Sequence, residues 1–352
     1  MNKKVKQSYV CSKVDQYMID PVLVCSYIPK AGDVGIFKVV SEEGGRLMTP
    51  GKFECKLLEG DYIMAAFGNR YATNQVEGYV PQQPVDRCQL LSRGGLVGHL
   101  KSMNSLMRIP PVELELVGYV LDPETCEVMN TICEDELKTF DPFLIRSKVI
   151  LSIGTSMDSG KTTSAAYLCG GLHRQGKKVA YMKLTGTAYP KDALLNEDLG
   201  ADFTCDFFDY GFPSTFGSSH ETILNLFQSL HDLAYEAVQP DYLVVEIADG
   251  ILQKETRMLL EDDRFMEAVS GVLFNAGDSL GAIAGLQLLE KLGIQPFAVS
   301  GLFTASELLI TEMKASCSLP VLRLGELLKG DALRYLEKNV RVGDVMPLAL
   351  RA

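Results

Sequence analysis

The pattern of apolar and polar residues divides the chain into two parts. From about residue 32 to residue 129, short apolar runs such as 34–40 and 62–67 alternate with Gly- and Pro-rich turns. Closely spaced runs of this kind predict a small all-β domain, either a barrel or a sandwich. From residue 148 onward, apolar runs alternate with longer segments of helical periodicity. This alternation predicts an α/β domain with a doubly wound, mainly parallel sheet.

The same pattern sets the expected boundaries. We expect an N-terminal arm over 1–30, a small β-barrel-like domain over 31–140 and the α/β domain over 148–352, after an acidic, Pro-containing stretch near 134–142. In the α/β domain, strands are expected at 148–153, 178–184, 241–247, 269–274, 296–301 and 319–323. Helices are expected at 161–175, 192–200, 220–237, 279–292, 305–315 and 325–338.

A glycine-rich loop lies between the first of these strands and the first helix. It is predicted to bind a nucleotide through Gly154, Thr155, Ser156, Met157, Asp158, Ser159, Gly160, Lys161, Thr162 and Thr163. The backbone N–H groups of such a loop and the N-terminus of the following helix bind phosphate oxygens. Lys161 is expected to reach the terminal phosphates, and the Thr162 hydroxyl to hold Mg²⁺. Because Thr155 stands where the strict pattern has its first glycine, the prediction depends on context; the alternative is an ordinary strand–turn–helix.

Three further candidates follow strands, where ligands bind in open α/β sheets. Glu246 ends an apolar run and is expected to hold Mg²⁺ or orient an attacking group, with Asp249 as the second candidate and a helix cap as the alternative. Lys183 is expected to neutralise charge that develops on a phosphate, unless it is a solvated strand-end lysine. Asn275 is expected to read a purine edge with its amide, unless it is a turn asparagine.

Asp158 lies inside the phosphate loop itself. An acid so close to phosphates is unfavourable unless it contacts a metal, a substrate or a lysine, so Asp158 is a candidate catalytic residue; the alternative is an exposed loop tip. Aromatic residues are frequent over 203–216. This segment is interpreted as a lid over a substrate, a loop facing a partner, or part of a core.

Composition narrows the function classes. The net charge of −11 argues against a large nucleic-acid surface. The absence of 18 consecutive apolar residues argues against a membrane span. The nine cysteines are scattered without C-x-x-C pairs, which favours reduced thiols, a cytoplasmic location and no zinc site.

Four segments resemble the dethiobiotin synthetase branch of P-loop NTPases, within the SIMIBI class that also holds Min-type ATPases and signal-recognition GTPases. They are 154–162, matching Gly-Thr-x-x-Glu-x-Gly-Lys-Thr with Asp158 in place of Glu; Lys183; Asp192-Ala193-Leu194; and Val245-Glu246 followed by Gly250. The resemblance implies that Asp192 and Glu246 bind Mg²⁺ together with Thr162. It also implies that Lys183 corresponds to the lysine that ends the family's second strand.

Residues 190–192 and 199–201 are also similar to adaptor proteins of molybdopterin-guanine dinucleotide biosynthesis, in which Gly-Lys-Asp precedes Ala-Gly-Ala at the same spacing. This similarity favours Asp192 over Asp198 as the metal ligand. Two features depart from the class: Thr155 replaces the lysine of Min-type ATPases, and 247–249 replaces the glycine pair after the strand glutamate. The resemblance covers about 148–330. It implies binding of a nucleotide and Mg²⁺, but not the substrate.

Two functions stay open from the sequence. The first is an ATP-dependent enzyme that passes the γ-phosphoryl group to a small acid or to water, with Lys161, Lys183, Asp158 and Glu246 as catalytic residues. The second is a nucleotide-controlled switch whose β-domain binds a protein partner. ATP is expected rather than GTP, because the chain lacks an Asn-Lys-x-Asp motif. A homodimer is an open alternative to a monomer.

Overall fold

The computed structural model describes residues 4–41 and 45–337. Its contacts divide the chain into two compact units. Within the described residues, unit 1 comprises 4–41, 45–139, 185–191 and 206–230, and unit 2 comprises 140–184, 192–205 and 231–337. The sequence boundaries assigned 185–191 and 206–230 to the α/β domain, whereas the structure packs both segments with unit 1. The outer ends of the expected arm and α/β domain, 1–3 and 338–352, lie outside the described residues.

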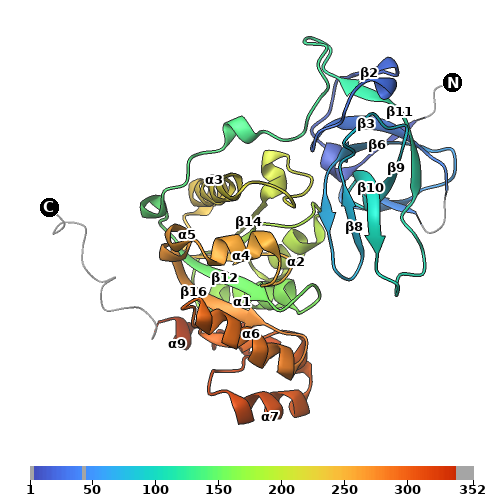
Figure 1. Cartoon of the computed structure of the whole chain (residues 1–352). Helices are drawn as coiled ribbons and strands as arrows, with labels where there is room; N and C mark the ends of the chain where they lie inside the picture. Colours follow the sequence, from blue (N-terminus) through green and yellow to red (C-terminus); the bar gives the residue numbers. More distant parts are fainter. Residues whose placement is uncertain (1–3, 42–44, 338–352) are drawn as a thin grey trace. The chain divides into compact units, whose positions relative to one another are not determined.

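Unit 1 is a mainly antiparallel β domain (Figure 1). Its strands are β1 Val5–Gln7, β2 Met18–Asp20, β3 Val34–Val39, β4 Arg46–Met48, β5 Glu54–Lys56, β6 Tyr62–Phe67, β7 Arg70–Tyr71, β8 Val76–Tyr79, β9 Arg87–Ser92, β10 Leu96–Met103 and β11 Glu113–Leu121. Five of them pair in a closed ring in the order β6-β3-β11-β9-β10-β6. The predicted β-barrel is therefore present, and residues of the expected arm add β1 to β6 and β2 to β11.

Alternation along the strands fills the interior of this barrel. Phe37, Ile63, Phe67, Leu114 and Tyr119 are all fully buried in one apolar cluster. Burial of such side chains stabilises a domain by about 1.5–3 kcal/mol each. Segment 206–230 also contributes buried aromatic side chains, namely Phe207, Phe208 and Phe212. Among the three interpretations of the aromatic stretch, this burial supports core packing.

Unit 2 contains a six-stranded sheet in the order β14-β13-β15-β12-β16-β17. Its strands are β12 Lys148–Gly154, β13 Val179–Lys183, β14 Phe203–Asp206, β15 Tyr242–Glu246, β16 Val269–Asn275 and β17 Ala298–Ser300. The pairings among β13, β15, β12, β16 and β17 are parallel. From β12 the chain moves to β13 on one side and later to β16 on the other, so the strand order reverses beside β12. The carboxyl end of a strand at such a reversal is where α/β sheets bind ligands.

Helices follow the strands of this sheet along the chain (Figure 1). They are α1 Lys161–Arg174, α2 Lys191–Leu199, α3 His220–Val238, α4 Lys254–Leu260, α5 Asp263–Glu267, α6 Ser279–Lys291, α7 Glu307–Ser316, α8 Leu324–Lys329 and α9 Leu333–Leu336. Residues 220–230 of α3 belong to unit 1. The helix α1 packs on β12, β13, β15 and α8. The doubly wound α/β prediction is confirmed: unit 2 is a P-loop-like α/β domain.

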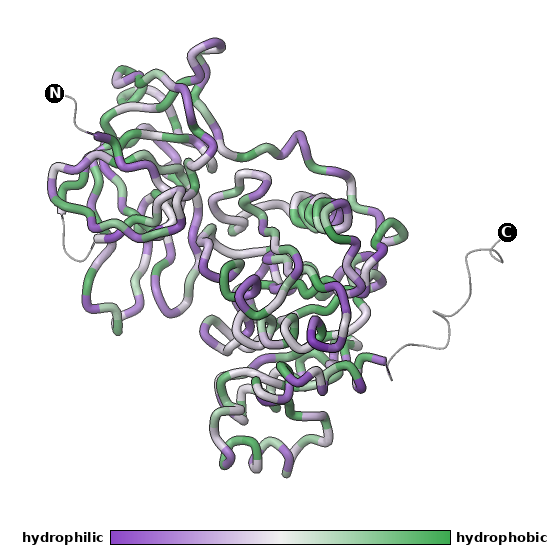
Figure 2. The backbone as a smooth tube through the Cα atoms, turned by 180° about the vertical axis from the view of Figure 1, so that it is seen from behind, coloured by the Kyte–Doolittle hydropathy of each residue, from purple (hydrophilic) through white to green (hydrophobic). Residues whose placement is uncertain are grey.

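Several elements differ from the expected ones, among them the short helices α4 and α5, which lie where no helix was expected. The strand expected at 319–323 forms only a single bridge between Val299 and Val321. The helix expected at 325–338 is divided into α8 and α9 at Gly330, whose φ of 86° is left-handed. The edge strand β14 was not expected, because aromatic residues in 203–216 obscured a short strand. Apolar stretches recur in both units between polar ones (Figure 2). Over the part of the chain that the structure describes, no helix combines the length and apolarity needed to cross a bilayer.

Candidate functional site

The phosphate-loop sequence forms the expected strand–loop–helix in unit 2. The strand β12 ends at Gly154, and α1 begins at Lys161 directly after Gly160. Gly160 has a φ of 94°, a conformation that side-chain-bearing residues rarely adopt. The helix N-terminus therefore faces the loop, where its unpaired N–H groups and the helix dipole favour an anion.

Neighbouring loops pack closely on the phosphate loop and fix its shape. A Cβ atom at Gly250, in the loop after β15, would lie 2.5 Å from the carbonyl oxygen of Thr155. A Cβ atom at Gly301, after β17, would lie 2.4 Å from the carbonyl oxygen of Ser159. The backbone N–H of Leu302 also donates to that Ser159 oxygen at 3.0 Å. Glycine is thus required at both places by the close approach of two backbones.

Lys161 is folded onto the loop that it follows. Its Nζ donates to the carbonyl oxygen of Ser156 at 2.7 Å, and the residue is only 5% exposed. Burial lowers the pKa of the Lys161 ammonium, while the carboxylates of Glu246 and Asp249 act in the opposite direction. Among the described residues, no carboxylate bonds directly to this buried ammonium, so an anionic ligand such as a phosphate would supply the missing opposite charge.

The Thr162 hydroxyl and the Glu246 carboxylate meet at the carboxyl edge of the sheet. Thr162 Oγ1 donates to Glu246 Oε1 at 2.8 Å. On the other carboxylate oxygen, the Tyr181 hydroxyl donates to Oε2 at 2.6 Å. Glu246 is 3% exposed, and its burial raises the pKa of the carboxyl group. The nearby Asp192 carboxylate raises this pKa further, whereas Lys183, Tyr181 and Lys161 oppose the shift.

Lys183 and Asp192 form an ion pair beside this carboxylate. Lys183 ends β13 directly opposite Glu246 of β15, so the two side chains project from the same face of the sheet. The exposed fractions of the paired side chains are 11% for Lys183 and 25% for Asp192. The structure therefore brings together four residues chosen from the sequence: Thr162, Lys183, Asp192 and Glu246.

Asn275 has a different environment from the one expected for a residue that reads a purine. It is fully buried, and its Nδ2 donates to Ser152 Oγ at 3.1 Å and to the carbonyl oxygen of Ile153 at 2.9 Å. Ser152 Oγ in turn donates to the carbonyl oxygen of Lys161 at 3.1 Å. In this arrangement the amide nitrogen of Asn275 joins β16 to β12 and to the first turn of α1. Asn275 Oδ1 has no hydrogen-bond partner within the described residues, and the expectation that the amide reads a purine edge stays a prediction.

The remaining loop residues are placed as follows. Asp158 is exposed with a φ of 61°, which corresponds to the loop-tip alternative in position. Ser156 is exposed, and its hydroxyl donates to the carbonyl oxygen of Met157. Ser159 is 1% exposed, and its hydroxyl has no hydrogen-bond partner within the described residues. A buried hydroxyl of this kind inside a phosphate loop is consistent with a ligand oxygen as its partner.

Two residues at the site were missed in the sequence. Tyr181 lies within an apolar run, and its ring gave no indication that its hydroxyl reaches Glu246. The signal was its position two residues before Lys183, because residues i and i+2 of a strand share a face. Ser152 stands one place before Ile153 in a buried strand, where a lone polar residue needs a partner.

A cavity of about 280 Å³ adjoins the phosphate loop. Its lining includes Gly160, Thr163, Ser164, Gly301, Leu302 and Arg323. The cavity thus lies beside the first turn of α1, with one cationic side chain at its wall.

Known proteins that resemble the chain are found among solved structures, at low similarity. No family model matches the chain. No curated protein matches it either. Among solved structures, a DUF1611 family protein from Anabaena variabilis is 12% identical with a TM-score of 0.40, over 58% of this chain and 61% of that one. The signal recognition particle receptor FtsY from Elizabethkingia anophelis is 15% identical with a TM-score of 0.36, over 55% and 65%.

Chloroplast FtsY from Physcomitrella patens is 16% identical with a TM-score of 0.37, over 60% of this chain and 70% of that one. A further structure of the Elizabethkingia receptor is a complex with GDP. This chain spans less than two thirds of the length of the Anabaena protein and of the Elizabethkingia receptor. Unit 2 is a parallel α/β domain in which a glycine-containing loop joins β12 to the N-terminus of α1.

Proposed function

We propose that unit 2 binds a nucleoside triphosphate with Mg²⁺, ATP being preferred, and transfers its γ-phosphoryl group to a small carboxylic acid or to water. The observation that carries this proposal is the 2.8 Å contact between Thr162 Oγ1 and Glu246 Oε1 directly behind the phosphate loop. It joins the first turn of α1 to the end of β15, where a nucleotide-bound cation is needed.

The residues present fit Mg²⁺. This ion takes oxygen ligands at about 2.0–2.1 Å in octahedral geometry, so neighbouring ligand oxygens lie about 2.9 Å apart. The observed separation of the Thr162 and Glu246 oxygens is close to this value. Asp192, held by Lys183, supplies a further carboxylate. When bound, the ion would neutralise charge on the phosphate oxygens.

The chain's own residues account for the rest of the chemistry. Lys161, which now donates to the Ser156 carbonyl, would exchange this oxygen for those of the terminal phosphates. Lys183 would stabilise the charge that develops while the bond from the γ-phosphorus to the bridging oxygen breaks and the bond to the acceptor oxygen forms. A carboxylate acceptor carries no proton that must be removed, whereas an attacking water must lose one, and Asp158 is the loop residue that would position this water and take its proton. Asn275 Nδ2 would stabilise the loop through the Ile153 carbonyl oxygen, which leaves only Oδ1 for a base.

The nucleoside would occupy the 280 Å³ cavity beside Gly160 and Thr163. Arg323 at its wall has a planar guanidinium that stacks favourably on an aromatic base.

Isothermal titration calorimetry of the full chain with ATP and with GTP, each with Mg²⁺ or with EDTA, tests this proposal. Lys161→Ala is expected to weaken binding at least about 100-fold, because a charge-assisted contact to phosphate is lost. Lys178→Ala is the matched control, since that lysine is exposed at the opposite, amino end of β13. Equal affinity in all three proteins would contradict the proposal. Phosphate release with a panel of small carboxylic acids then tests the acceptor.

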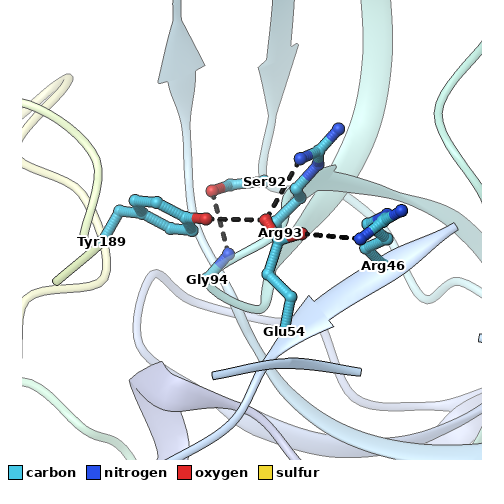
Figure 3. A network of polar contacts seen from close by, with 6 residues as sticks. All are labelled: Arg46, Glu54, Ser92, Arg93, Gly94 and Tyr189. Carbon is cyan, nitrogen blue, oxygen red and sulfur yellow. Dashed lines mark hydrogen bonds and ion pairs between the residues drawn. The ribbon is translucent and has the colours of Figure 1, made fainter. Parts of the chain in front are cut away.

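One observation favours a switch as the second candidate function. Segment 185–191, which connects Lys183 to Asp192, packs within unit 1. There the Tyr189 hydroxyl donates to Glu54 Oε1 at 2.7 Å (Figure 3). A Cβ atom at Gly94 would lie 2.2 Å from the carbonyl oxygen of Ala188. A rearrangement of the Lys183–Asp192 pair on nucleotide binding would therefore displace the two ends of a segment held by the β-domain.

Hydrogen exchange of segment 185–191 with and without Mg·ATP distinguishes the two functions. The switch predicts changed protection in this segment and slow turnover that a protein partner stimulates. The enzyme predicts turnover that a small acid stimulates, whether or not the protection changes.

A further inference from the structure

A tyrosine inside unit 2 has no role in the phosphate chemistry described above. Tyr181 lies in the middle of β13, is fully buried, and packs in the apolar cluster between the sheet and α1. Its hydroxyl is a polar group in an apolar layer, where an unpaired hydroxyl would cost about 1–3 kcal/mol. The hydroxyl is paired with Glu246 Oε2 at 2.6 Å.

The register of the two strands explains how the tyrosine reaches the carboxylate. Lys183 is opposite Glu246, and Tyr181 is opposite Val244. Because side chains alternate along a strand, Tyr181, Lys183 and Glu246 all project from one face. The length of the tyrosine ring spans the two-residue offset along the strand, which a shorter hydroxyl side chain would not cover.

The contact restricts the orientation of the carboxylate. Oε2 accepts from Tyr181 on the β13 side, and Oε1 accepts from Thr162 on the α1 side. With both oxygens engaged on opposite sides, rotation about the last side-chain bond would break one of the two contacts. Oε1 is thereby kept next to the threonine hydroxyl.

The chemical nature of the donor matters as much as its position. An arginine or lysine in this place would orient the carboxylate but cancel its charge, and would compete with a bound cation. The tyrosine hydroxyl is a neutral group, and it donates to Glu246 Oε2 at 2.6 Å. It therefore orients the carboxylate and leaves the negative charge available.

We propose that Tyr181 is a positioning residue for the magnesium ligand Glu246: its hydroxyl holds Oε2 so that Oε1 is presented to the ion beside Thr162. This inference rests on the proposed function, and deepens it by adding a residue outside the phosphate loop. Partners of this kind behind a metal ligand typically contribute 10–100-fold to metal affinity.

The test compares the Mg²⁺ dependence of nucleotide binding in Tyr181→Phe and in the wild type. The concentration of Mg²⁺ that gives half-maximal binding of ATP is expected to rise about 10-fold in Tyr181→Phe. Binding of ATP in EDTA is expected to stay the same, because the phosphate loop is untouched. Tyr242→Phe is the matched control, since Tyr242 is a buried tyrosine at the other end of the adjacent strand β15.

A second measurement covers the case in which the variant folds poorly. In the wild-type protein with ATP, adding Mg²⁺ is expected to shift the ultraviolet absorption of a tyrosine, because the hydrogen-bonded carboxylate changes its charge environment. The signal should persist in Tyr242→Phe.

The outcomes separate the two proposals. If the wild type binds no nucleotide, the proposed function and this inference are both overturned. If the wild type binds Mg·ATP and Tyr181→Phe requires the same Mg²⁺ concentration within twofold, only the inference is overturned. It is also overturned if the variant loses binding equally with Mg²⁺ and with EDTA, or if the wild-type spectrum does not respond to Mg²⁺.

Discussion

Each unit contains a glutamate whose carboxylate accepts a hydrogen bond from a tyrosine hydroxyl. In unit 1, Glu54 Oε1 accepts from Tyr189 at 2.7 Å and from the guanidinium of Arg93 at 3.1 Å (Figure 3). Arg46 lies 3.4 Å from the other oxygen, and the Glu54 side chain is 21% exposed. In unit 2, Glu246 accepts from Tyr181 and Thr162 and is almost fully buried.

The two environments shift the pKa values of the two carboxyl groups in opposite directions. The hydrogen bond from Tyr189 and the two arginines lower the pKa of Glu54. Burial raises the pKa of Glu246 despite the lysines nearby. A carboxylate that two guanidinium groups already neutralise is suited to holding β4, β5 and the 185–191 segment together. A buried carboxylate that receives only neutral hydroxyl donors directly has charge left for a cation, at a cost to stability.

The largest effect that tests this comparison is expected from Glu246→Gln. The amide keeps the size of the side chain but removes its charge. The factor by which Mg²⁺ strengthens ATP binding should therefore fall by about 100-fold or more, because a metal ligand itself is lost and not only a residue that orients it, as in Tyr181→Phe. Calorimetry with Mg²⁺ and with EDTA measures this factor. Retention of the wild-type Mg²⁺ dependence would remove Glu246 from the metal site.

The same variant, Glu246→Gln, should lose Mg²⁺-dependent binding without losing thermal stability. Because the pKa of Glu246 is raised in the folded state, its ionised form destabilises the protein as the pH rises from about 4.5, the ordinary value, toward the folded value. Glu246→Gln should therefore unfold at the same or a higher temperature than the wild type at pH 8, with the difference disappearing in acid. Thermal unfolding at both pH values checks this.

Lys183→Met is expected to have the next largest effect, on stability. Removing the ammonium leaves the Asp192 carboxylate near that of Glu246. Breaking a fully buried pair costs about 3–5 kcal/mol. Because Asp192 is a quarter exposed, we expect about 2 kcal/mol here, measured by denaturant unfolding. Adding Asp192→Asn should restore part of this loss; strict additivity of the two changes would show that the pair is not coupled.

Glu54→Gln should destabilise the protein less, by about 1 kcal/mol at pH 7, because ion pairs near the surface contribute little. The sign of the pH dependence is opposite to that of Glu246. Since the pKa of Glu54 is lowered in the folded state, its contribution is present above about 4.5, the ordinary value, and is lost as the pH falls through the folded value. The wild type and the variant should therefore unfold alike in strong acid, and a difference that persists there would contradict the assignment.

The two glutamates also show what the sequence could predict. Glu246 was identified because it ends an apolar run, and the carboxyl ends of parallel strands meet at one edge. Lys183, Thr162 and the phosphate loop follow from the same local rule. Glu54 carried no such signal. Arg46 lies on the neighbouring strand β4, but Arg93 comes from 39 residues further along the chain, and Tyr189 comes from a segment inserted from the α/β part.

Tertiary contacts also limited what the sequence could predict for Asn275 and for two segments of the α/β part. Asn275 was correctly placed at a strand end, but whether its amide faces a ligand or the neighbouring strand depends on the Ser152 hydroxyl across the sheet. Segments 185–191 and 206–230 were assigned to the α/β domain because they follow its strands in the chain. Their contacts with unit 1 depend on tertiary packing, which periodicity does not contain.

The smallest expected effect comes from Tyr189→Phe, the same chemical change as Tyr181→Phe at the other glutamate. Glu54 keeps both arginines in this variant, so the loss of one hydrogen bond should cost only about 0.5 kcal/mol. The Mg²⁺ concentration for half-maximal ATP binding should be unchanged, in contrast to the rise expected for Tyr181→Phe. If Tyr189→Phe raises this Mg²⁺ concentration equally, the affinity for the ion depends on segment 185–191 through Lys183 and Asp192. The division into a structural and a metal-binding glutamate would then be wrong, and the switch function would be favoured over the enzyme.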